Sequence, residues 1–373
     1  MKKMLMVATV PSMIGQFNMN NIQLLQEMGY EVHVACDFTD RSVWTEERVT
    51  QFEETLEEKD IQKYQVDFSR SALRIDRHIA SYRQLKQVIK QNNYNFVHCH
   101  TPIAGAISRF VCKNTKMKCI YTAHGFHFYK GAPLKNWLLF YPIEWICSWM
   151  TDVLITINKE DYNRAKKCLH AKKTEYVPGV GVDLRKFGQA TVNKSTKRRE
   201  LGIPEDSILL LSVGELNENK NHETVIRAIK DLDVYYIIAG KGDLREYLEK
   251  VIDEIGLTER IKLLGFRRDV SELYQAADIY VLPSVREGLN VSIMEAMASG
   301  LPAICSKIRG NIDLIKDEDC LFHPGSVSEC SNAIDTIRKR NLSDLISDNL
   351  KMVQSFDIRV VQQKMDCIYR RRK

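Results

Sequence analysis

The sequence predicts an α/β protein made of two doubly wound domains, and three observations carry this prediction. The chain has 373 residues, roughly twice the ~150 typical of one domain. Short runs rich in β-branched residues alternate with amphipathic helical segments throughout, which is typical of parallel sheets covered by helices. A stretch with Pro and Gly but little periodic hydrophobicity, residues 177–195, separates two such series and predicts a boundary near 180–190.

The first series contains six expected strands and two prominent helical segments, at residues 76–91 and 132–150. The strands are expected at 3–9, 31–35, 63–66, 96–98, 118–121 and 152–156. The second series is expected to form strands at 208–213, 234–239, 261–263, 279–281 and 303–305. Both series are typical of doubly wound sheets, whose ligands bind at the carboxyl ends of the strands.

Composition and charge narrow the class of protein. Hydrophobic residues make up 44% and charged residues 27% of the chain, a globular composition that excludes disorder and collagen. The net charge is only +6, but residues 61–135 hold 13 Lys and Arg against Asp67 and Asp76 alone. This polarised half suggests an anionic partner, and nucleic acid is disfavoured because no recognised binding module accompanies the charge.

The cysteines and the apolar segments indicate where in the cell the protein is expected. The ten cysteines form no CxxC pair and have no regular spacing, which favours reduced thiols in a cytoplasmic protein. The first residues show no signal-peptide pattern. The most apolar window, 137–150, contains Pro142 and Glu144 and is shorter than the ~20 residues needed to span a bilayer.

Residues 286–295, directly after an expected strand, form the strongest candidate site. A turn containing Gly288 and a helix starting near Asn290 would aim free N–H groups and the positive helix end at a ligand. Such a site suits an anion, most naturally a diphosphate. Glu295 would then accept from ribose hydroxyls, and Glu287 from sugar hydroxyls or face developing positive charge. On spacing alone, a solvated Glu287 and a helix-face Glu295 remain an open alternative.

The segment VREGLNVSIMEAMASGLPAI resembles the signature of the family 4 retaining glycosyltransferases, two Glu separated by seven residues. Further matching blocks are HTP at 100–102, TAHG at 122–125, GVGVD at 179–183, VGELNENKN at 213–221, IAGKGD at 238–243 and LLGFRRDVSELY at 263–274. HCHTP, TAHGFHF, KGAPLKNWLL and ITINKEDY look especially like bacterial exopolysaccharide and capsule members.

The resemblance implies a GT-B fold, two Rossmann-like domains facing across a cleft. Residues 1–185 would form the acceptor-side domain and residues 186–355 the nucleotide-sugar domain. A C-terminal helix, 356–373, would pack back toward the N-terminal domain.

The resemblance also implies residue roles. Lys220 would neutralise the donor diphosphate as charge develops, His124 would contact the donor sugar, and Glu287 would act near the reacting sugar. The residues expected to bind the donor are Gly15, Glu215, Lys220, Gly240, Gly242, Arg267, Glu287, Gly288, Leu289, Asn290 and Glu295.

Two positions depart from the family pattern. Glu215 stands where an Arg is usual, and a carboxylate beside a diphosphate is repulsive unless it turns aside. Three interpretations remain open. Lys220, the helix N-terminus and Arg286 would neutralise the donor diphosphate without an Arg at position 215, or Glu215 would contact Lys220 or sugar hydroxyls. In the third interpretation, catalysis is lost. The first loop, which contains Gly15, lacks the paired glycines that are usual in the family, and it also lacks a GxGxxG fingerprint.

The sequence predicts no metal site. His98 and His100 flank Cys99 as zinc ligands could, but no third ligand is evident; we expect one partly buried histidine and one at the mouth of the cleft. The acidic pairs Asp231/Asp233 and Asp317/Asp319 resemble Mg²⁺-binding DxD motifs, yet each is expected in a solvated turn.

Residues 130–150 carry more aromatic surface than one core-facing side of a helix needs. With the basic residues nearby, this segment would lie against the anionic inner leaflet of the cytoplasmic membrane. A buried core helix beside an ordinary basic surface is the alternative.

Together these inferences predict a retaining, metal-independent and cofactor-free glycosyltransferase. It would move a hexose or N-acetylhexosamine from a UDP-sugar to a polyprenyl-diphosphate saccharide in exopolysaccharide or capsule synthesis. A UDP-N-acetylhexosamine epimerase, or a weakly catalytic nucleotide-sugar-binding scaffold suggested by Glu215, is the alternative.

Overall fold

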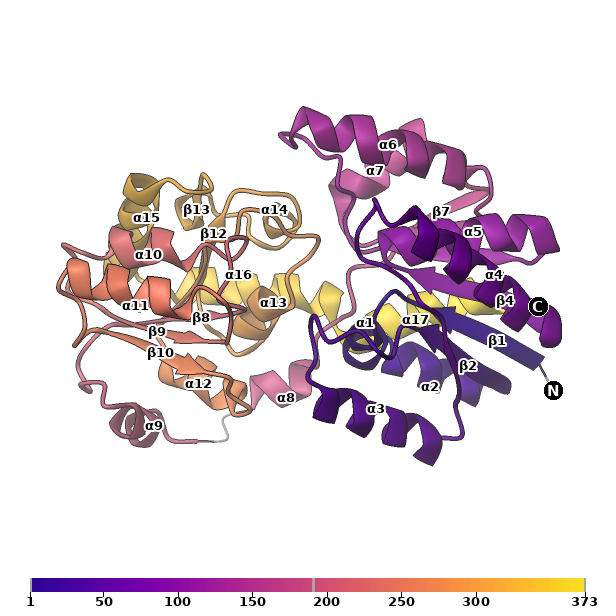
Figure 1. Ribbon diagram of the computed structural model, residues 1–373. Coiled ribbons are helices and arrows are strands. Elements are labelled where there is room, and N and C mark those ends of the chain that lie inside the picture. The colour runs from indigo at the N-terminus through magenta and orange to yellow at the C-terminus, as the bar shows by residue number, and fades with distance from the viewer. Residues whose placement is uncertain (1, 190–191, 372–373) are drawn as a thin grey trace. The chain divides into compact units, whose positions relative to one another are not determined.

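The computed structural model describes residues 2–189 and 192–371 (Figure 1). Contacts divide the chain into two units. The N-terminal unit consists of Met1–Val180 and Val361–Lys373, and the C-terminal unit is Gly181–Val360. Each unit contains one parallel sheet, so the prediction of two doubly wound α/β domains is confirmed.

The N-terminal sheet has seven parallel strands in the order β3-β2-β1-β4-β5-β6-β7. Their bounds are β1 Lys2–Val7, β2 Tyr30–Cys36, β3 Gln62–Gln65, β4 Tyr94–His100, β5 Cys119–Ala123, β6 Val153–Thr156 and β7 Lys173–Tyr176. Central strands are apolar because helices cover both faces of the sheet, and Met4–Val7 of β1 are fully buried. The edge strand β7 has the polar sequence KTEY and is only half-buried, so the sequence pattern did not predict it.

The helices of this unit are α1 Pro11–Phe17, α2 Met19–Glu27, α3 Glu46–Glu58, α4 Ile75–Gln91, α5 Pro102–Thr115, α6 Leu134–Ser148, α7 Lys159–Cys168 and α17 Ile358–Arg370. The last helix, α17, contributes Val361, Met365, Ile368 and Tyr369 to the core that also contains β1 and β2. Their spacing places them on one helix face. Residues far apart in the chain therefore complete one hydrophobic core.

The C-terminal sheet has six parallel strands in the order β10-β9-β8-β11-β12-β13. The strands are β8 Leu209–Val213, β9 Tyr235–Ala239, β10 Ile261–Gly265, β11 Ile279–Leu282, β12 Ala303–Ser306 and β13 Leu321–Phe322. The helices are α8 Leu184–Gly188, α9 Lys194–Leu201, α10 His222–Ala228, α11 Arg245–Glu254, α12 Val270–Ala276, α13 Val291–Ala298, α14 Asn311–Leu314, α15 Val327–Lys339 and α16 Ser343–Val353, with 3₁₀ turns η1 Glu318–Cys320 and η2 Gln354–Phe356.

Both sheets reverse their strand order at one point, between β1 and β4 and between β8 and β11. In open α/β sheets, ligands bind outside the carboxyl ends of the strands at such a switch point. Each unit therefore presents one favoured ligand edge. All ten cysteines are free thiols, and no helix within the described ranges is long and apolar enough to cross a membrane.

Candidate functional site

The loops after β8 and β11 are joined by hydrogen bonds at the switch point of the C-terminal sheet. The N–H of Val285 donates to the carbonyl of Asn219 at 2.7 Å, and the Asn219 amide donates to the carbonyl of Arg286 at 3.0 Å. The two loops thus form one platform although they are separated by more than sixty residues of sequence.

Lys220 and Glu287 form an ion pair on this platform. The Lys220 Nζ lies 2.7 Å from Glu287 Oε1, and the two side chains are only 18% and 13% exposed. The Lys220 stem rests against Gly214, where a Cβ would come within 3.2 Å of the lysine Cε. An ammonium has three donors, so a single carboxylate contact orients Lys220 and leaves donors for a second anion.

Helix α13 starts where the sequence predicted. Asn290 is its N-cap, with the side-chain oxygen accepting from the N–H of Ile293 at 3.2 Å. Asn290 and Leu289 are buried, so they fix the turn that precedes the helix. Gly288 is held against Gly310, where a Cβ would lie 2.2 Å from the Gly288 carbonyl oxygen; the positive φ of Gly310 also favours glycine there.

Glu295 lies on α13 and accepts a hydrogen bond from the Tyr274 hydroxyl at 2.9 Å. Burial raises the pKa of Glu295, while the Tyr274 hydroxyl opposes that rise. The carboxylate is therefore held in place and incompletely solvated, which suits an acceptor for ligand hydroxyls.

Gly240 and Gly242 have a packing reason of their own. A Cβ on Gly240 would lie 1.7 Å from the Gly214 carbonyl oxygen, and one on Gly242 would lie 2.3 Å from that of Leu216. Both glycines let the turn after β9 approach the turn after β8. The close packing of these two turns therefore explains both glycines without a ligand.

Three residues expected at the donor are exposed or make other contacts in the structure. Glu215 is exposed, and the carboxylate paired with Lys220 is that of Glu287. Arg267 donates to Asp269 at 2.7 Å and to Glu200 at 3.0 Å. Gly15 lies inside α1, where a Cβ would come 2.4 Å from the ring of Trp44, so this glycine makes room for an aromatic side chain.

The N-terminal unit gathers histidines at the carboxyl ends of β4 and β5. His124 is half-buried, and its Nε2 lies 3.0 Å from His100 Nδ1. His98 contacts the hydroxyls of Tyr369 at 2.9 Å and Thr122 at 2.8 Å. Burial lowers the pKa of His98 to about 3 and that of His124 to about 4, and lowers the pKa of His100 well below its usual range. All three rings are therefore neutral at pH 7.

One expectation for these histidines was wrong. His98 and His100 are both fully buried, so His100 does not lie at the mouth of a cleft. It lies beneath His124, because residues two apart on a strand share a face and β4 and β5 are neighbours.

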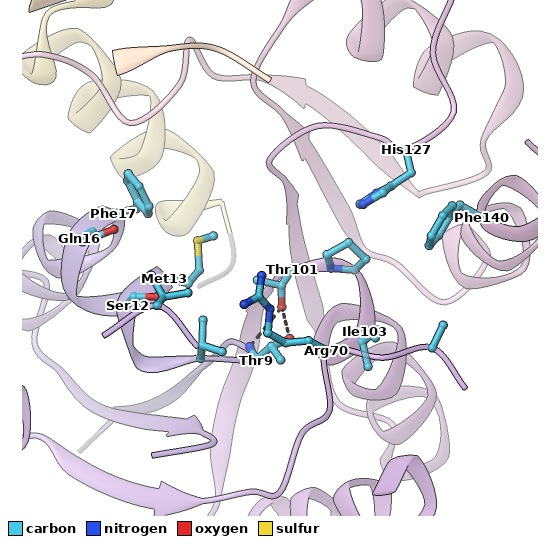
Figure 2. Close-up of a pocket in the computed structure, with 14 residues that line it drawn as sticks. Thr9, Ser12, Met13, Gln16, Phe17, Arg70, Thr101, Ile103, His127 and Phe140 are labelled. Atoms are coloured by element: carbon cyan, nitrogen blue, oxygen red, sulfur yellow. Dashed lines mark hydrogen bonds between the residues drawn. The ribbon is translucent and has the colours of Figure 1, made fainter. Parts of the chain in front are cut away.

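A cavity of about 460 Å³ lies at the switch point of the N-terminal sheet. Figure 2 shows the Arg70 side chain near the centre of its lining, with α1 side chains on one side and His127 and Phe140 on the other. The lining residues are Thr9, Val10, Ser12, Met13, Gln16, Phe17, Val43, Arg70, Ala72, Thr101, Pro102, Ile103, His127 and Phe140. No acidic residue is among them, so the cavity combines apolar walls with one full positive charge.

The sequence did not predict this cavity. In the structure Thr101, from the HTP block, has a backbone φ of 65°, a strained value for a β-branched residue. The Thr101 hydroxyl lies 2.7 Å from that of Thr9, which ties the ends of β1 and β4 together.

Neither acidic pair lies at a ligand edge. Asp317 caps η1 and pairs with Arg340 at 2.6 Å, and Asp231 lies in a turn before β9. Within residues 2–189 and 192–371, no group of three or more His, Cys, Asp or Glu side chains is arranged to hold a metal.

Comparison with known proteins places the chain in a family. The model "Glycosyltransferase Family 4" matches residues 15–186, and "Glycosyl transferases group 1" matches residues 193–350. EpsD of Bacillus subtilis, which is named as a glycosyltransferase, is 36% identical over 85% of this chain and 81% of its own. A UDP-Gal:α-D-GlcNAc-diphosphoundecaprenol α-1,3-galactosyltransferase of Escherichia coli is 30% identical over 74% of each chain.

A solved structure supports the fold. HepE of Anabaena, determined in complex with UDP and glucose, superposes with a TM-score of 0.77 over 98% of both chains at 19% identity. The chain is therefore a glycosyltransferase of the GT-B fold, and it belongs to family 4, among the bacterial polysaccharide glycosyltransferases.

Proposed function

We propose that this enzyme transfers a hexose or N-acetylhexosamine from a UDP-sugar to a polyprenyl-diphosphate-linked saccharide, with retention of configuration. The Lys220–Glu287 ion pair, which lies on the switch-point platform of the C-terminal unit, carries the proposal. The printed name of the Escherichia coli relative, with its UDP-sugar donor and diphosphoundecaprenol acceptor, supports the same substrate classes.

Lys220 would act on the leaving group. The donor diphosphate would lie by its ammonium and the start of α13, whose unpaired N–H groups favour an anion. Negative charge grows on the diphosphate as the bond from sugar C1 to the phosphate oxygen breaks, and a preorganised cation stabilises that charge. Glu287 would hold Lys220 in position and lie near the reacting sugar, while Glu295 would accept from the ribose hydroxyls.

The anomeric configuration would be retained because the acceptor attacks sugar C1 on the same face from which the leaving group departs. The acceptor hydroxyl oxygen forms its bond to C1 on that face, and its proton passes to the departing diphosphate oxygen. UDP and the glycosylated acceptor are the products, so the step needs no protein nucleophile and no cofactor. His124, neutral at pH 7, would hydrogen-bond a hydroxyl of the transferred sugar.

The acceptor would occupy the cavity of the N-terminal unit. Its apolar wall, with Met13, Phe17 and Phe140, suits the first isoprene units or a sugar face. Arg70 would pair with the acceptor diphosphate, since guanidinium groups bind phosphate oxygens strongly. The Arg70 guanidinium donates to the neutral Ser42 hydroxyl at 2.7 Å, and it has no ion-pair partner among the residues that the structure describes.

Helix α6 would attach the enzyme to the membrane that carries this acceptor. Its buried side is anchored to α5 by an Arg109–Glu144 ion pair, while its outer side exposes large apolar side chains. These are Leu134, Leu138, Leu139, Ile143, Trp145 and Ile146, followed by Trp149, all between 40% and 73% exposed. Such an apolar helix face with tryptophans suits the bilayer interface.

The deciding experiment offers purified enzyme a panel of UDP-sugars with a synthetic lipid-diphosphate saccharide, with and without excess EDTA. We expect one UDP-sugar to yield UDP and an extended acceptor with the donor's anomeric configuration, at the same rate in EDTA. Loss of activity in EDTA with recovery only on adding Mg²⁺ would contradict the roles given to Lys220 and α13. A new UDP-sugar formed without acceptor would instead indicate the epimerase.

A further inference from the structure

A second cavity in the N-terminal unit, also of about 460 Å³, carries a strong positive charge. Its lining residues are Cys112, Lys113, Lys116, Met117, Lys118, Trp149, Met150, Asp152 and Lys172. Asp152, the single carboxylate of this lining, already accepts from Lys172 Nζ and from the N–H of Cys119, both at 2.8 Å. In the part of the chain that the structure describes, Lys113, Lys116 and Lys118 have no ion-pair partner, so the cavity holds three uncompensated charges.

The cavity adjoins the apolar face of α6. Trp149 lines it and is 58% exposed, and the neighbouring Trp145 and Ile146 are 40% and 49% exposed. Trp149 is fixed by stacking on His170, with ring centroids 4.1 Å apart. A ligand here would therefore meet three solvent-exposed lysines that line the cavity and an apolar surface beside them.

We propose that this cavity binds the phosphate of an anionic phospholipid whose acyl chains lie along α6. This inference rests on the proposed membrane attachment and adds lipid selectivity to it. A free inorganic phosphate would use the lysines but gain nothing from the apolar rim, whereas a bilayer lipid uses both. Phe140 of α6 lines the cavity proposed for the acceptor, and Trp149, directly after α6, lines the lysine cavity, so this helix borders both cavities.

Flotation on vesicles tests the lipid site. The variant K113Q/K116Q/K118Q is compared with K59Q/R83Q/K90Q, which removes the same charge outside the cavity, on pure phosphatidylcholine and on mixtures with phosphatidylglycerol. We expect the cavity variant to partition onto the anionic vesicles roughly 100-fold less than wild type, with the control near wild type. All three should bind neutral vesicles alike through α6.

Equal losses in the two triple variants would mean that only net charge matters and would overturn the cavity proposal. Binding of inorganic phosphate as tight as that of anionic vesicles would assign the cavity to a soluble anion. Failure of wild type to bind any vesicle would instead remove the proposed membrane attachment. Unchanged UDP-sugar hydrolysis checks that the cavity variant keeps an intact donor site.

An independent observation concerns the protonation of His124. His100 Nδ1 lies 3.0 Å from His124 Nε2, and His100 Nε2 lies 3.1 Å from the thioether sulfur of Met6. Met6, His100 and His124 come from β1, β4 and the loop after β5, so three adjacent strands align these groups.

A thioether sulfur accepts hydrogen bonds but cannot donate them. His100 therefore directs its single N–H from Nε2 toward Met6 and keeps a lone pair on Nδ1. That lone pair accepts the N–H of His124, which must then be on Nε2. His124 is left with a bare Nδ1, for which the described residues provide no partner.

We infer that His100 is a positioning residue that fixes His124 as the Nε2–H tautomer, so that Nδ1 accepts a hydrogen bond from a substrate hydroxyl. The inference deepens the role proposed for His124 and depends on it only for the identity of the hydroxyl. Met6 is the origin of the arrangement, because its sulfur decides which nitrogen of His100 carries the proton.

Long-range ¹H–¹⁵N correlation spectra of the histidine rings test the tautomer directly. We expect wild type to show His124 protonated at Nε2. Met6→Leu removes the acceptor at nearly constant volume and should convert His124 wholly or partly to the Nδ1–H form, while Met4→Leu, at an equally buried position of β1, should leave it unchanged.

Kinetics give a second readout. His100→Asn can still present an acceptor near the former Nδ1 and should keep more kcat than His100→Leu, which we expect to lose at least tenfold at unchanged donor KM. Wild type protonated at Nδ1, or a Met6→Leu spectrum identical to wild type, would overturn the inference. The inferred tautomer together with a fully active His124→Ala variant would instead overturn the proposed role of His124.

Discussion

The two sheets share a strand order but differ in what they present at their ligand edges. In the C-terminal unit the edge carries the Lys220–Glu287 ion pair and the start of α13. In the N-terminal unit it carries neutral histidines and an apolar cavity with Arg70. Topology therefore decides where a ligand binds, whereas the first residues after each strand decide its chemistry. One edge suits a diphosphate leaving group and the other an amphiphilic acceptor.

The largest expected effect on catalysis comes from removing the charge of Lys220 at the edge of the C-terminal sheet. Lys220→Ala should lower kcat by roughly 2–4 kcal/mol of barrier, because the lost cation faces charge that grows in the transition state. Glu287→Gln should lower kcat in the same direction, and the double variant should cost much less than the sum since the two residues act as a unit. Steady-state kinetics on variants with wild-type thermal melts measure this; additive losses or an unchanged kcat would place the reaction elsewhere.

The two edges should also respond oppositely to pH. The pKa values of His98, His100 and His124 are lowered by burial, so the unfolded chain binds more protons as pH falls below 6.5 and the N-terminal unit loses stability. The pKa of Glu295 is raised by burial, so its contribution to stability is lost as pH rises above the usual glutamate range. Acid should therefore weaken the N-terminal unit first.

Tryptophan fluorescence makes this measurable, because Trp44, Trp137, Trp145 and Trp149 are the four tryptophans of the chain and all lie in the N-terminal unit. Urea titrations followed by fluorescence should show a lower midpoint at pH 5 than at pH 7. A fluorescence midpoint independent of pH would mean that these histidines are not kept neutral by the fold.

An intermediate effect tests the uncharged edge. Arg70→Ala should raise the acceptor KM about tenfold and leave the donor KM unchanged, since a hydrogen bond to a charged group is worth about 1.5–3 kcal/mol. Arg74→Ala serves as control because Arg74 pairs with Asp76 at 2.8 Å on the surface. Equal effects of the two substitutions on the acceptor KM would argue against the cavity as the acceptor site.

Glu295→Gln should raise the donor KM severalfold with a small change in kcat, because ribose hydroxyls are bound alike in the ground and transition states. At pH 7.5 the same variant should have a higher free energy of unfolding than wild type, because it lacks the buried charge. This difference should be smaller at pH 4.5. A kcat loss as large as that of Lys220→Ala would move Glu295 to the reacting sugar.

The smallest expected effect is that of Arg267→Ala. This guanidinium is held by Asp269 and Glu200, whose carboxylates also contact Lys197 at 2.7 Å. Removal should change the donor KM less than twofold and stability by at most about 1 kcal/mol, as for other surface pairs. A tenfold rise in donor KM would instead support the donor-binding role that the sequence predicts for Arg267.

The sequence predicted the fold well where residues signal their own environment. The apolar strands and the N-cap Asn290 lie where they were expected, because burial and capping leave local patterns. The polar edge strand β7 and the two-residue β13 lack such a pattern and were missed. Lys220 and Glu287 were each predicted as site residues, but their pairing depends on the adjacency of β8 and β11.

The rest of the site depends on contacts that sequence does not encode locally. The cavity proposed to hold the acceptor is lined by residues from several separate segments, so no single stretch of sequence indicates it. Asp269 lies two residues from Arg267 in the sequence, so their contact is local. Glu200 reaches Arg267 only because α9 packs against α12. The Met6–His100–His124 alignment likewise needs the order of three strands.

Helix α17 has a consequence for how this enzyme is made. Its Tyr369 is fully buried, stacks on Phe96 of β4 and contacts His98, so the N-terminal core is incomplete until α17 has left the ribosome. Domains usually fold in the order of their synthesis, yet here the unit that is translated first is completed last. The C-terminal unit, whose residues are contiguous, can therefore acquire its structure before the core of the N-terminal unit is complete.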